Sequence, residues 1–120
     1  MITSKKKFGN WGENLAQEYL RRHHYTIITA NYRTGRREID LIARHNGQVT
    51  FIEVKTRIKT PASLADNPLS ARQIKNLQQA IIVYCLKNLL SFETVRLDLI
   101  IIIADRQSQK VRFKHYRDIF

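Results

Sequence analysis

Residues 38–55 read EIDLIARHNGQVTFIEVK and carry most of the structural and functional information in the sequence. Asn46-Gly47 stands between two apolar runs. This dipeptide favours a two-residue type I′ turn, because both central residues of such a turn need a positive φ. The stretch therefore predicts a β-hairpin that turns at Asn46-Gly47.

The turn also fixes which residues of the hairpin face each other. Asp40 is expected to face Glu53, and Glu38 to face Lys55, on one side of the ribbon. The other predicted pairs are apolar: Ile42 with Phe51, Leu41 with Ile52, and Ile39 with Val54. Like charges directly opposite each other destabilise a sheet, so the facing carboxylates need a use that offsets their repulsion.

A divalent cation would provide that use. Mg²⁺ and Mn²⁺ prefer carboxylate oxygens, and Mg²⁺ usually takes one or two protein carboxylates together with water and substrate phosphate. We therefore expect Asp40 and Glu53 to be metal ligands, with the backbone carbonyl of Val54 as a further one. Lys55, on the same strand face as Glu53, would stabilise charge on a phosphate. A salt bridge to Glu38 is a compatible alternative for Lys55.

The net charge points to a polyanionic partner. The chain has 21 Lys and Arg against 10 Asp and Glu, a formal charge of +11 and a pI near 10.2. Basic side chains bind phosphates and release counterions. Nucleic acid fits better than a membrane surface, because no basic amphipathic helix with a Trp or Phe face is evident. The expected contacts are Lys5, Lys6, Lys7, Arg33, Arg36, Arg37, Arg57, Lys59, Arg72 and Lys75.

Length and composition favour a single domain over residues 1–120. No apolar stretch approaches the roughly 18 residues of a membrane span, and the N-terminal charges precede no apolar signal segment. The single cysteine, Cys85, is expected to be a small buried side chain. These features predict a cytoplasmic protein.

The remaining elements follow from periodicity and from turn residues. Residues 1–9 are predicted to be a flexible basic arm, and residues 58–69 a mobile loop. Asp98, on an apolar strand, is expected to be a buried partner of Arg96 or Arg33. The predicted elements are a helix over 11–23 capped by Asn10, a strand over 25–33, the hairpin over 38–57, a helix from Ser70 to about Lys87, and strands over 95–104 and 109–116.

This order resembles a known nuclease fold. A helix, three strands, a helix and a strand, with Asp on the second strand and Glu-x-Lys on the third, resemble the restriction-endonuclease-like core of the PD-(D/E)xK superfamily. Several further motifs are Gly12-Glu13, Ala16, Asn31-x-Arg33, Glu38-Ile39-Asp40-Leu41-Ile42-Ala43 and Phe51-Ile52-Glu53-Val54-Lys55-Thr56-Arg57. Together they resemble the bacterial YraN-like family, which narrows the resemblance.

The resemblance implies an α/β fold, α-β-β-β-α-β, with a mixed central sheet flanked by helices and an added C-terminal edge strand. It also implies a Mg²⁺- or Mn²⁺-dependent nuclease acting on DNA. Asp40, Glu53 and Lys55 would be catalytic, and Glu13 would join them, although Glu13 could instead favour the helix start. Gln73 stands where relatives often carry Lys, so it is a candidate accessory residue of the active site. It is also expected to close a capping box with Ser70. The alternative is a non-catalytic nucleic-acid-binding module on the same fold.

Overall fold

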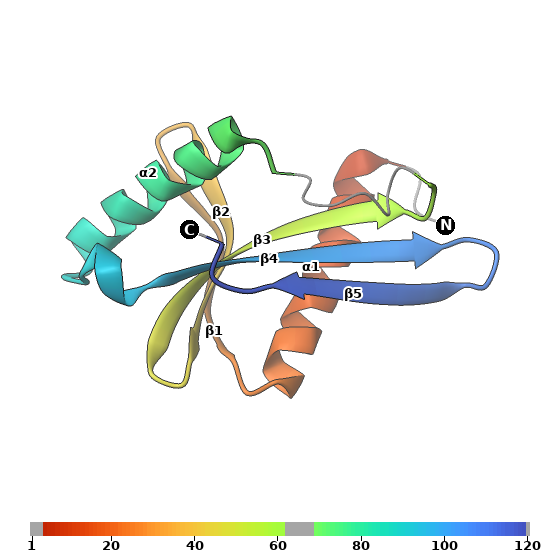
Figure 1. The fold of residues 1–120 in the computed structure, drawn as a ribbon, viewed down its shortest axis with the longest axis horizontal. Helices are drawn as coiled ribbons and strands as arrows, with labels where there is room; N and C mark the ends of the chain where they lie inside the picture. Colours follow the sequence, from red (N-terminus) through yellow and green to blue (C-terminus); the bar gives the residue numbers. More distant parts are fainter. Residues whose placement is uncertain (1–3, 62–68, 120) are drawn as a thin grey trace.

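The computed structural model describes residues 4–61 and 69–119. These residues form the order helix-strand-strand-strand-helix-strand-strand (Figure 1), which is the order expected from the sequence. The elements are α1 (Lys5–Arg22), β1 (Thr26–Thr34), β2 (Arg37–His45), β3 (Gln48–Ile58), α2 (Ala71–Lys87), the short 3₁₀ helix η2 (Phe92–Thr94), β4 (Arg96–Asp105) and β5 (Lys110–Tyr116).

The strands form one mixed sheet in the order β1-β2-β3-β4-β5. Strands β1, β2 and β3 are joined antiparallel, and β5 adds antiparallel to β4. Strands β3 and β4 are parallel, with α2 in the crossover between them. β4 is almost fully buried along its run of isoleucines, as a central strand covered on both faces should be. The mixed α/β fold is therefore confirmed.

The two helices cover opposite faces of the sheet (Figure 1). Leu77 and Ile81 of α2 pack with Phe51 and Leu99 in one buried cluster. Ala16 and Leu20 of α1 belong to a second cluster, formed by the alternate residues of the same strands. Because successive strand residues point to opposite faces, each central strand contributes to both clusters.

The β2–β3 hairpin has the predicted turn. Asn46 and Gly47 have φ values of 51° and 76°, as a type I′ turn requires. The register is also as predicted, from His45 opposite Gln48 to Leu41 opposite Ile52.

Beyond Leu41 the predicted pairing is wrong. The β2–β3 register ends at Leu41 and Ile52, and the β1–β2 register passes from Leu41 to Ile39 across Asp40. Ile39 consequently lies in the cluster under α2, whereas Leu41 lies in the cluster under α1. Asp40 thus lies at an irregularity after which the side chains of β2 point to the opposite faces of the sheet. As a result Ile39 and Val54, predicted to be an apolar pair on one face, belong to clusters on opposite faces.

Helix α1 begins earlier than the sequence suggested. It starts at Lys5, and its N-cap is Ser4, whose Oγ accepts a 3.2 Å hydrogen bond from the N–H of Lys7. The prediction of a flexible arm is therefore wrong from Lys5 onward, and Asn10 lies inside the helix instead of capping it. The rings of Phe8 and Trp11, one turn apart, stack at 5.6 Å and support the extra turns. Residues 1–3 of the predicted arm lie outside the described residues.

The remaining elements agree with expectation, with one partial exception. Ser70 and Gln73 form the predicted capping box at the start of α2, and Cys85 is buried. Of the predicted mobile loop, Ile58 belongs to β3, and residues 62–68 lie outside the described residues. Within residues 4–61 and 69–119, no helix has both the length and the apolar character needed to cross a membrane.

Candidate active site

Three side chains of the hairpin meet where β2 and β3 separate. Nζ of Lys55 lies 3.3 Å from Oε2 of Glu53, and Glu53 also shares a hydrogen bond with Asp40. Oδ2 of Asp40 accepts a 2.9 Å hydrogen bond from the backbone N–H of Val54. The structure thus brings Asp40, Glu53 and Lys55 together. Lys55 pairs with Glu53, whereas Glu38 pairs with Arg33 at 3.3 Å.

The environment of Glu53 disfavours its charged form. Burial is the largest cause, and the negative charge of Asp40 adds to it, so that the pKa of Glu53 rises to about 8 although Lys55 lowers it in part. The side chain is 14% exposed. At neutral pH the carboxyl group therefore holds a proton, which its hydrogen bond with Asp40 accommodates. A bound cation would take the place of that proton.

Glu13 approaches the same carboxylates from α1. Its pKa rises to about 7, through burial first and then through the charges of Asp40 and Glu38. The side-chain amide of Asn31 bridges two of these groups when its nitrogen faces them. It then donates to Oε1 of Glu13 at 3.0 Å and to Oε1 of Glu38 at 3.1 Å. Glu13, which the resemblance placed at the site, therefore lies beside the cluster.

Asn31 is a site residue that reasoning from the sequence missed. It lies in β1 with a φ of 54°, in the left-handed region that Asn adopts more easily than most residues. That conformation coincides with the interruption in the β1–β2 register, which passes from Ala30 to Tyr32. The available signal was the Asn31-x-Arg33 motif, but it carried no indication of a bridging contact.

Gly12 allows α1 to pack closely against β3, which brings Glu13 near the acidic cluster. Gly12 is buried against β3, and a Cβ placed there would lie 2.0 Å from Oγ1 and 3.0 Å from Cβ of Thr56. Real side-chain carbons do not approach so closely. The backbone of α1 therefore rests directly on β3 beside Lys55, and Glu13 follows Gly12 in the chain.

The donor set of this cluster suits a hard divalent cation. Asp40 and Glu53 offer carboxylate oxygens at one place, and the raised pKa of Glu53 shows that nearby positive charge would favour its ionised form. In the part of the chain that the structure describes, no three His, Cys, Asp or Glu side chains surround a common point. Two carboxylates with water and a phosphate are a sufficient set for Mg²⁺. The carbonyl of Val54 as a further ligand stays a prediction.

Two clefts border the cluster. One, of about 200 Å³, is lined by Arg36 and Arg37 together with Glu38, Glu53 and Gln73, besides Asn76 and Leu77 of α2. Gln73 therefore both closes the capping box and faces this cleft, so its two predicted roles are compatible. Arg37 also donates to Oε1 of Gln79.

The other cleft is larger and lies between α1 and β3. Its volume is about 440 Å³, and its lining includes Lys5, Glu13, Lys55 and Arg57. The acidic cluster thus lies between two hollows that each hold basic side chains, from Arg36 and Arg37 on one side to Lys5 and Arg57 on the other.

The other predicted nucleic-acid contacts lie outside these two clefts. Arg33 is exposed beside Glu38, and Lys59 pairs with Asp105 at 3.3 Å in a separate hollow. The remaining four are exposed side chains in the first turns of the helices: Lys6, Lys7, Arg72 and Lys75.

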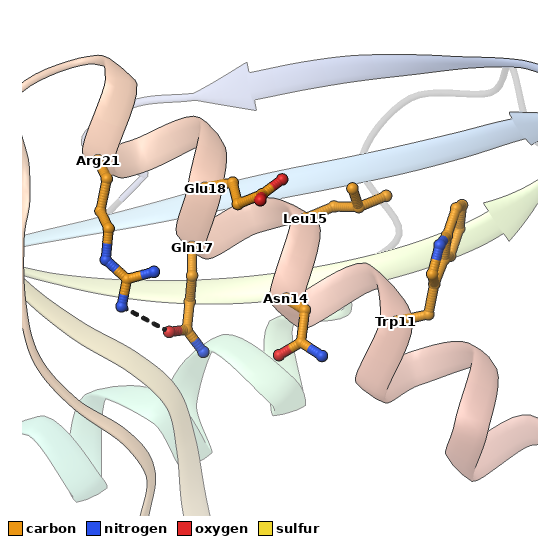
Figure 2. A pocket seen from close by; sticks show the side chains of 6 residues that line it. All are labelled: Trp11, Asn14, Leu15, Gln17, Glu18 and Arg21. Atoms are coloured by element: carbon orange, nitrogen blue, oxygen red, sulfur yellow. Dashed lines mark hydrogen bonds between the residues drawn. The ribbon is translucent and has the colours of Figure 1, made fainter.

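A further hollow, of about 330 Å³, lies on the outer side of α1. Figure 2 shows its lining along the helix, from Trp11 near the N-terminal end to Arg21, with Arg21 donating to Gln17 at 3.2 Å. All six lining residues belong to α1. None of the candidate catalytic residues lines it, so it is separate from the acidic cluster.

Asp98 has a structural role at a different place. It is fully buried, and its carboxylate accepts two hydrogen bonds from Arg96, at 2.8 and 2.9 Å, which confirms the predicted ion pair. Nε2 of His115 lies 2.7 Å from Oδ2, and the N–H of Asp118 donates at 3.0 Å. Asp98 therefore ties β5 and the residues after it to the centre of the sheet.

These features define a mixed α/β protein with a restriction-endonuclease-like order of elements and a carboxylate–lysine cluster on its central hairpin. Residues 12–102 match the model of the family described as "Uncharacterised protein family UPF0102". A UPF0102 protein of Syntrophomonas wolfei is 32% identical over 106 residues, or 88% of this chain and 92% of the relative. One from Christiangramia forsetii is 35% identical over 119 residues, or 99% and 98%. The chain belongs to the UPF0102 family, which confirms the YraN-like resemblance.

Two solved structures are similar in outline. The crystal structure of SSO0001 has a TM-score of 0.47 and 16% identity, covering 97% of this chain and 52% of that one. The structure of Pyrococcus furiosus SfsA in complex with Ca²⁺ has a TM-score of 0.39 and 16% identity, covering 92% and 61%. This chain thus spans between half and two thirds of those chains.

Proposed function

We propose that this protein is a Mg²⁺- or Mn²⁺-dependent nuclease that hydrolyses phosphodiester bonds in DNA. One observation carries the proposal: the partly buried, hydrogen-bonded carboxylates of Asp40 and Glu53 lie with Lys55 between two clefts that contain basic side chains. Such a pair is unfavourable in a metal-free protein, because desolvation and mutual repulsion both oppose ionisation. Binding a cation would offset both effects.

Each residue then has a defined part. Asp40 and Glu53 hold the cation, which when bound supplies a Lewis acid for the phosphate and lowers the pKa of an attacking water. The ammonium group of Lys55 stabilises negative charge that develops on the phosphate oxygens. Glu13, whose pKa of about 7 lies close to neutral, can accept a proton from a nearby water.

The basic side chains position the nucleic acid. Arg36 and Arg37 on one side of the cluster and Lys5 and Arg57 on the other can contact successive phosphates of one backbone. Such contacts supply affinity without reading the base sequence. The net charge of +11 supports the same partner.

The test is a cleavage assay on purified protein with single-stranded, duplex and branched DNA, each with Mg²⁺ or Mn²⁺. We expect wild type to cut at least one substrate, and Asp40→Asn and Lys55→Ala to lose about 100-fold or more of the rate. Lys87→Ala, which removes an exposed lysine at the end of α2, is the matched control and should cut like wild type. Binding without any cutting would instead identify a non-catalytic nucleic-acid-binding module.

A further inference from the structure

The cleft between α1 and β3 has an aromatic wall as well as charged ones. Phe8 lines it together with Lys5, and Lys55 and Arg57 line it from β3. The ring of Phe8 stacks on Trp11 with a centroid distance of 5.6 Å and an interplanar angle of 14°. Trp11 does not line this cleft, so it supports the ring of Phe8 from outside.

The cleft also has room beside the aromatic ring. A Cβ built at Gly9 would meet nothing within 4 Å, so the helix surface next to Phe8 is open. The volume of about 440 Å³ falls within the range of small-molecule pockets, roughly 300–1,000 Å³. The cleft therefore has volume for a flat group beside Phe8 and the residues of β3 that line it.

The combination of a ring with flanking cations identifies the kind of group. Aromatic side chains stack unpaired bases, and basic side chains beside them hold the neighbouring phosphates. In a duplex each base already stacks on its neighbours and is paired, so its flat face is not available to a protein ring. The cleft thus fits a nucleotide of a single strand.

We propose that Phe8 stacks an unpaired base and so directs the active site to single-stranded nucleic acid, including the single-stranded part of a branched molecule. This inference rests on the proposed function for the reaction itself. Lys55 and Glu13 line the same cleft as Phe8. A base held there places its own phosphates beside the carboxylate cluster, where Lys5 of α1 and Arg57 of β3 line the same cleft.

The proposal is tested by binding in the absence of metal, which separates it from cleavage. Fluorescently labelled oligothymidylate and a blunt duplex of equal length are titrated with protein, and anisotropy is measured. Wild type should bind the single strand more tightly. Phe8→Leu, which keeps apolar bulk but removes the ring, should weaken single-strand binding roughly 5- to 100-fold and leave duplex binding unchanged.

Two further variants complete the design. Phe8→Tyr keeps the ring and should bind like wild type. Phe113→Ala removes another partly exposed ring, on β5, and should also bind like wild type. Trp11 is the single tryptophan of the chain, so quenching of its fluorescence by the single strand reports stacking near Phe8 independently.

Equal binding by Phe8→Leu and Phe8→Tyr, or equal losses for single strand and duplex, would overturn the proposal. If metal-dependent cutting that requires Asp40 is found together with that result, the proposed nuclease stands and this inference alone fails. If the aromatic-dependent preference for single strands is found in a protein that cuts nothing, the inference stands and the nuclease activity fails.

Discussion

The backbone N–H of Val54 donates a 2.9 Å hydrogen bond to Oδ2 of Asp40 across the β2–β3 pair. At this point a side-chain carboxylate accepts from the neighbouring strand, just beyond the last paired residues of the ladder, Leu41 and Ile52. The bond fixes the orientation of the Asp40 carboxylate next to Glu53. It therefore links the irregularity in β2 to the geometry of the candidate site.

This relationship predicts the effect of Asp40→Asn on Glu53. The amide oxygen can still accept from the N–H of Val54, but the negative charge that raises the pKa of Glu53 is gone. The pKa of Glu53 should fall below about 8 and stay above 4.5, because burial, the largest cause, remains. Carboxyl ¹³C NMR titration of the labelled protein measures it. An unchanged pKa would mean that Asp40 does not act on Glu53.

Glu53→Gln should stabilise the metal-free protein in a pH-dependent way. The pKa of Glu53 is about 8 in the folded state and 4.5 in the unfolded chain. Between these two pH values Glu53 is ionised in the unfolded chain but still protonated in the folded one, so wild type loses stability as the pH rises. Glutamine does not titrate. We expect a gain of about 1–3 kcal/mol at pH 8 and a smaller one at pH 5.

Urea unfolding at the two pH values measures this gain. Glu18→Gln, at an exposed position of α1, is the matched control and should change stability little at either pH. A Glu53→Gln variant that is less stable than wild type at pH 8 would contradict the account.

Gly12→Ala should have the opposite effect to Gly9→Ala, although both glycines lie in α1. At Gly9 an added Cβ meets nothing, so the higher helix propensity of alanine should stabilise by roughly 0.5–1 kcal/mol. At Gly12 the Cβ would lie 2.0 Å from Oγ1 of Thr56, and overpacking of this kind costs about 1–3 kcal/mol. Thermal unfolding measures both variants.

The same clash should also affect Glu13, because α1 must move away from β3 to accommodate it. Gly12→Ala is therefore expected to reduce any cleavage activity, whereas Gly9→Ala leaves Glu13 in place. Truncating Thr56 to Ala in the Gly12→Ala protein should restore part of the lost stability. A Gly12→Ala protein as stable as the Gly9→Ala protein would show that α1 does not rest on Thr56.

Asp98→Asn should destabilise the fold without involving the active site. Burial alone would raise the pKa of Asp98, but hydrogen bonds from His115 and Arg96 outweigh it and hold the pKa below its usual value. The stability from this ionised group is present at neutral pH and is lost as pH falls below about 3.8. Leaving Arg96 without its charged partner should cost about 3–5 kcal/mol.

Chemical denaturation at pH 7 measures that loss, and Glu93→Gln in η2 serves as an exposed control. We expect the difference in stability between Asp98→Asn and wild type to shrink in acid, where wild-type Asp98 takes up a proton. A loss of stability that did not depend on pH would contradict the role assigned to its charge.

Local rules predicted the hairpin well, because its turn and register depend on neighbouring residues. Asn46-Gly47 is enough to specify the turn, and alternation specifies the pairing up to Leu41. The irregularity at Asp40 was not predictable in this way. It depends on a side-chain hydrogen bond to Val54 and on the left-handed backbone of Asn31 in the adjoining strand.

The candidate site was predicted in composition but not in its supporting contacts. The charged residues at facing positions of the hairpin can be read from the sequence, so Asp40, Glu53 and Lys55 could be named together. The approach of Gly12 to Thr56, and the link from Asp98 to His115, join residues far apart in the chain. The start of α1 was misjudged because Ser4 and Asn10 are both good N-caps, and the Phe8–Trp11 stack favours the earlier one.

Metal removal and restoration in a single-turnover cleavage assay would show whether Asp40 and Glu53 form a metal-dependent active site. Protein treated with EDTA and then freed of it should not cut labelled DNA, and added Mg²⁺ or Mn²⁺ should restore cutting. Asp40→Asn, folded and given the same metal, should remain about 100-fold slower or more. Cutting that persists in EDTA, or that is as fast in Asp40→Asn as in wild type, would contradict a metal-dependent site at Asp40 and Glu53.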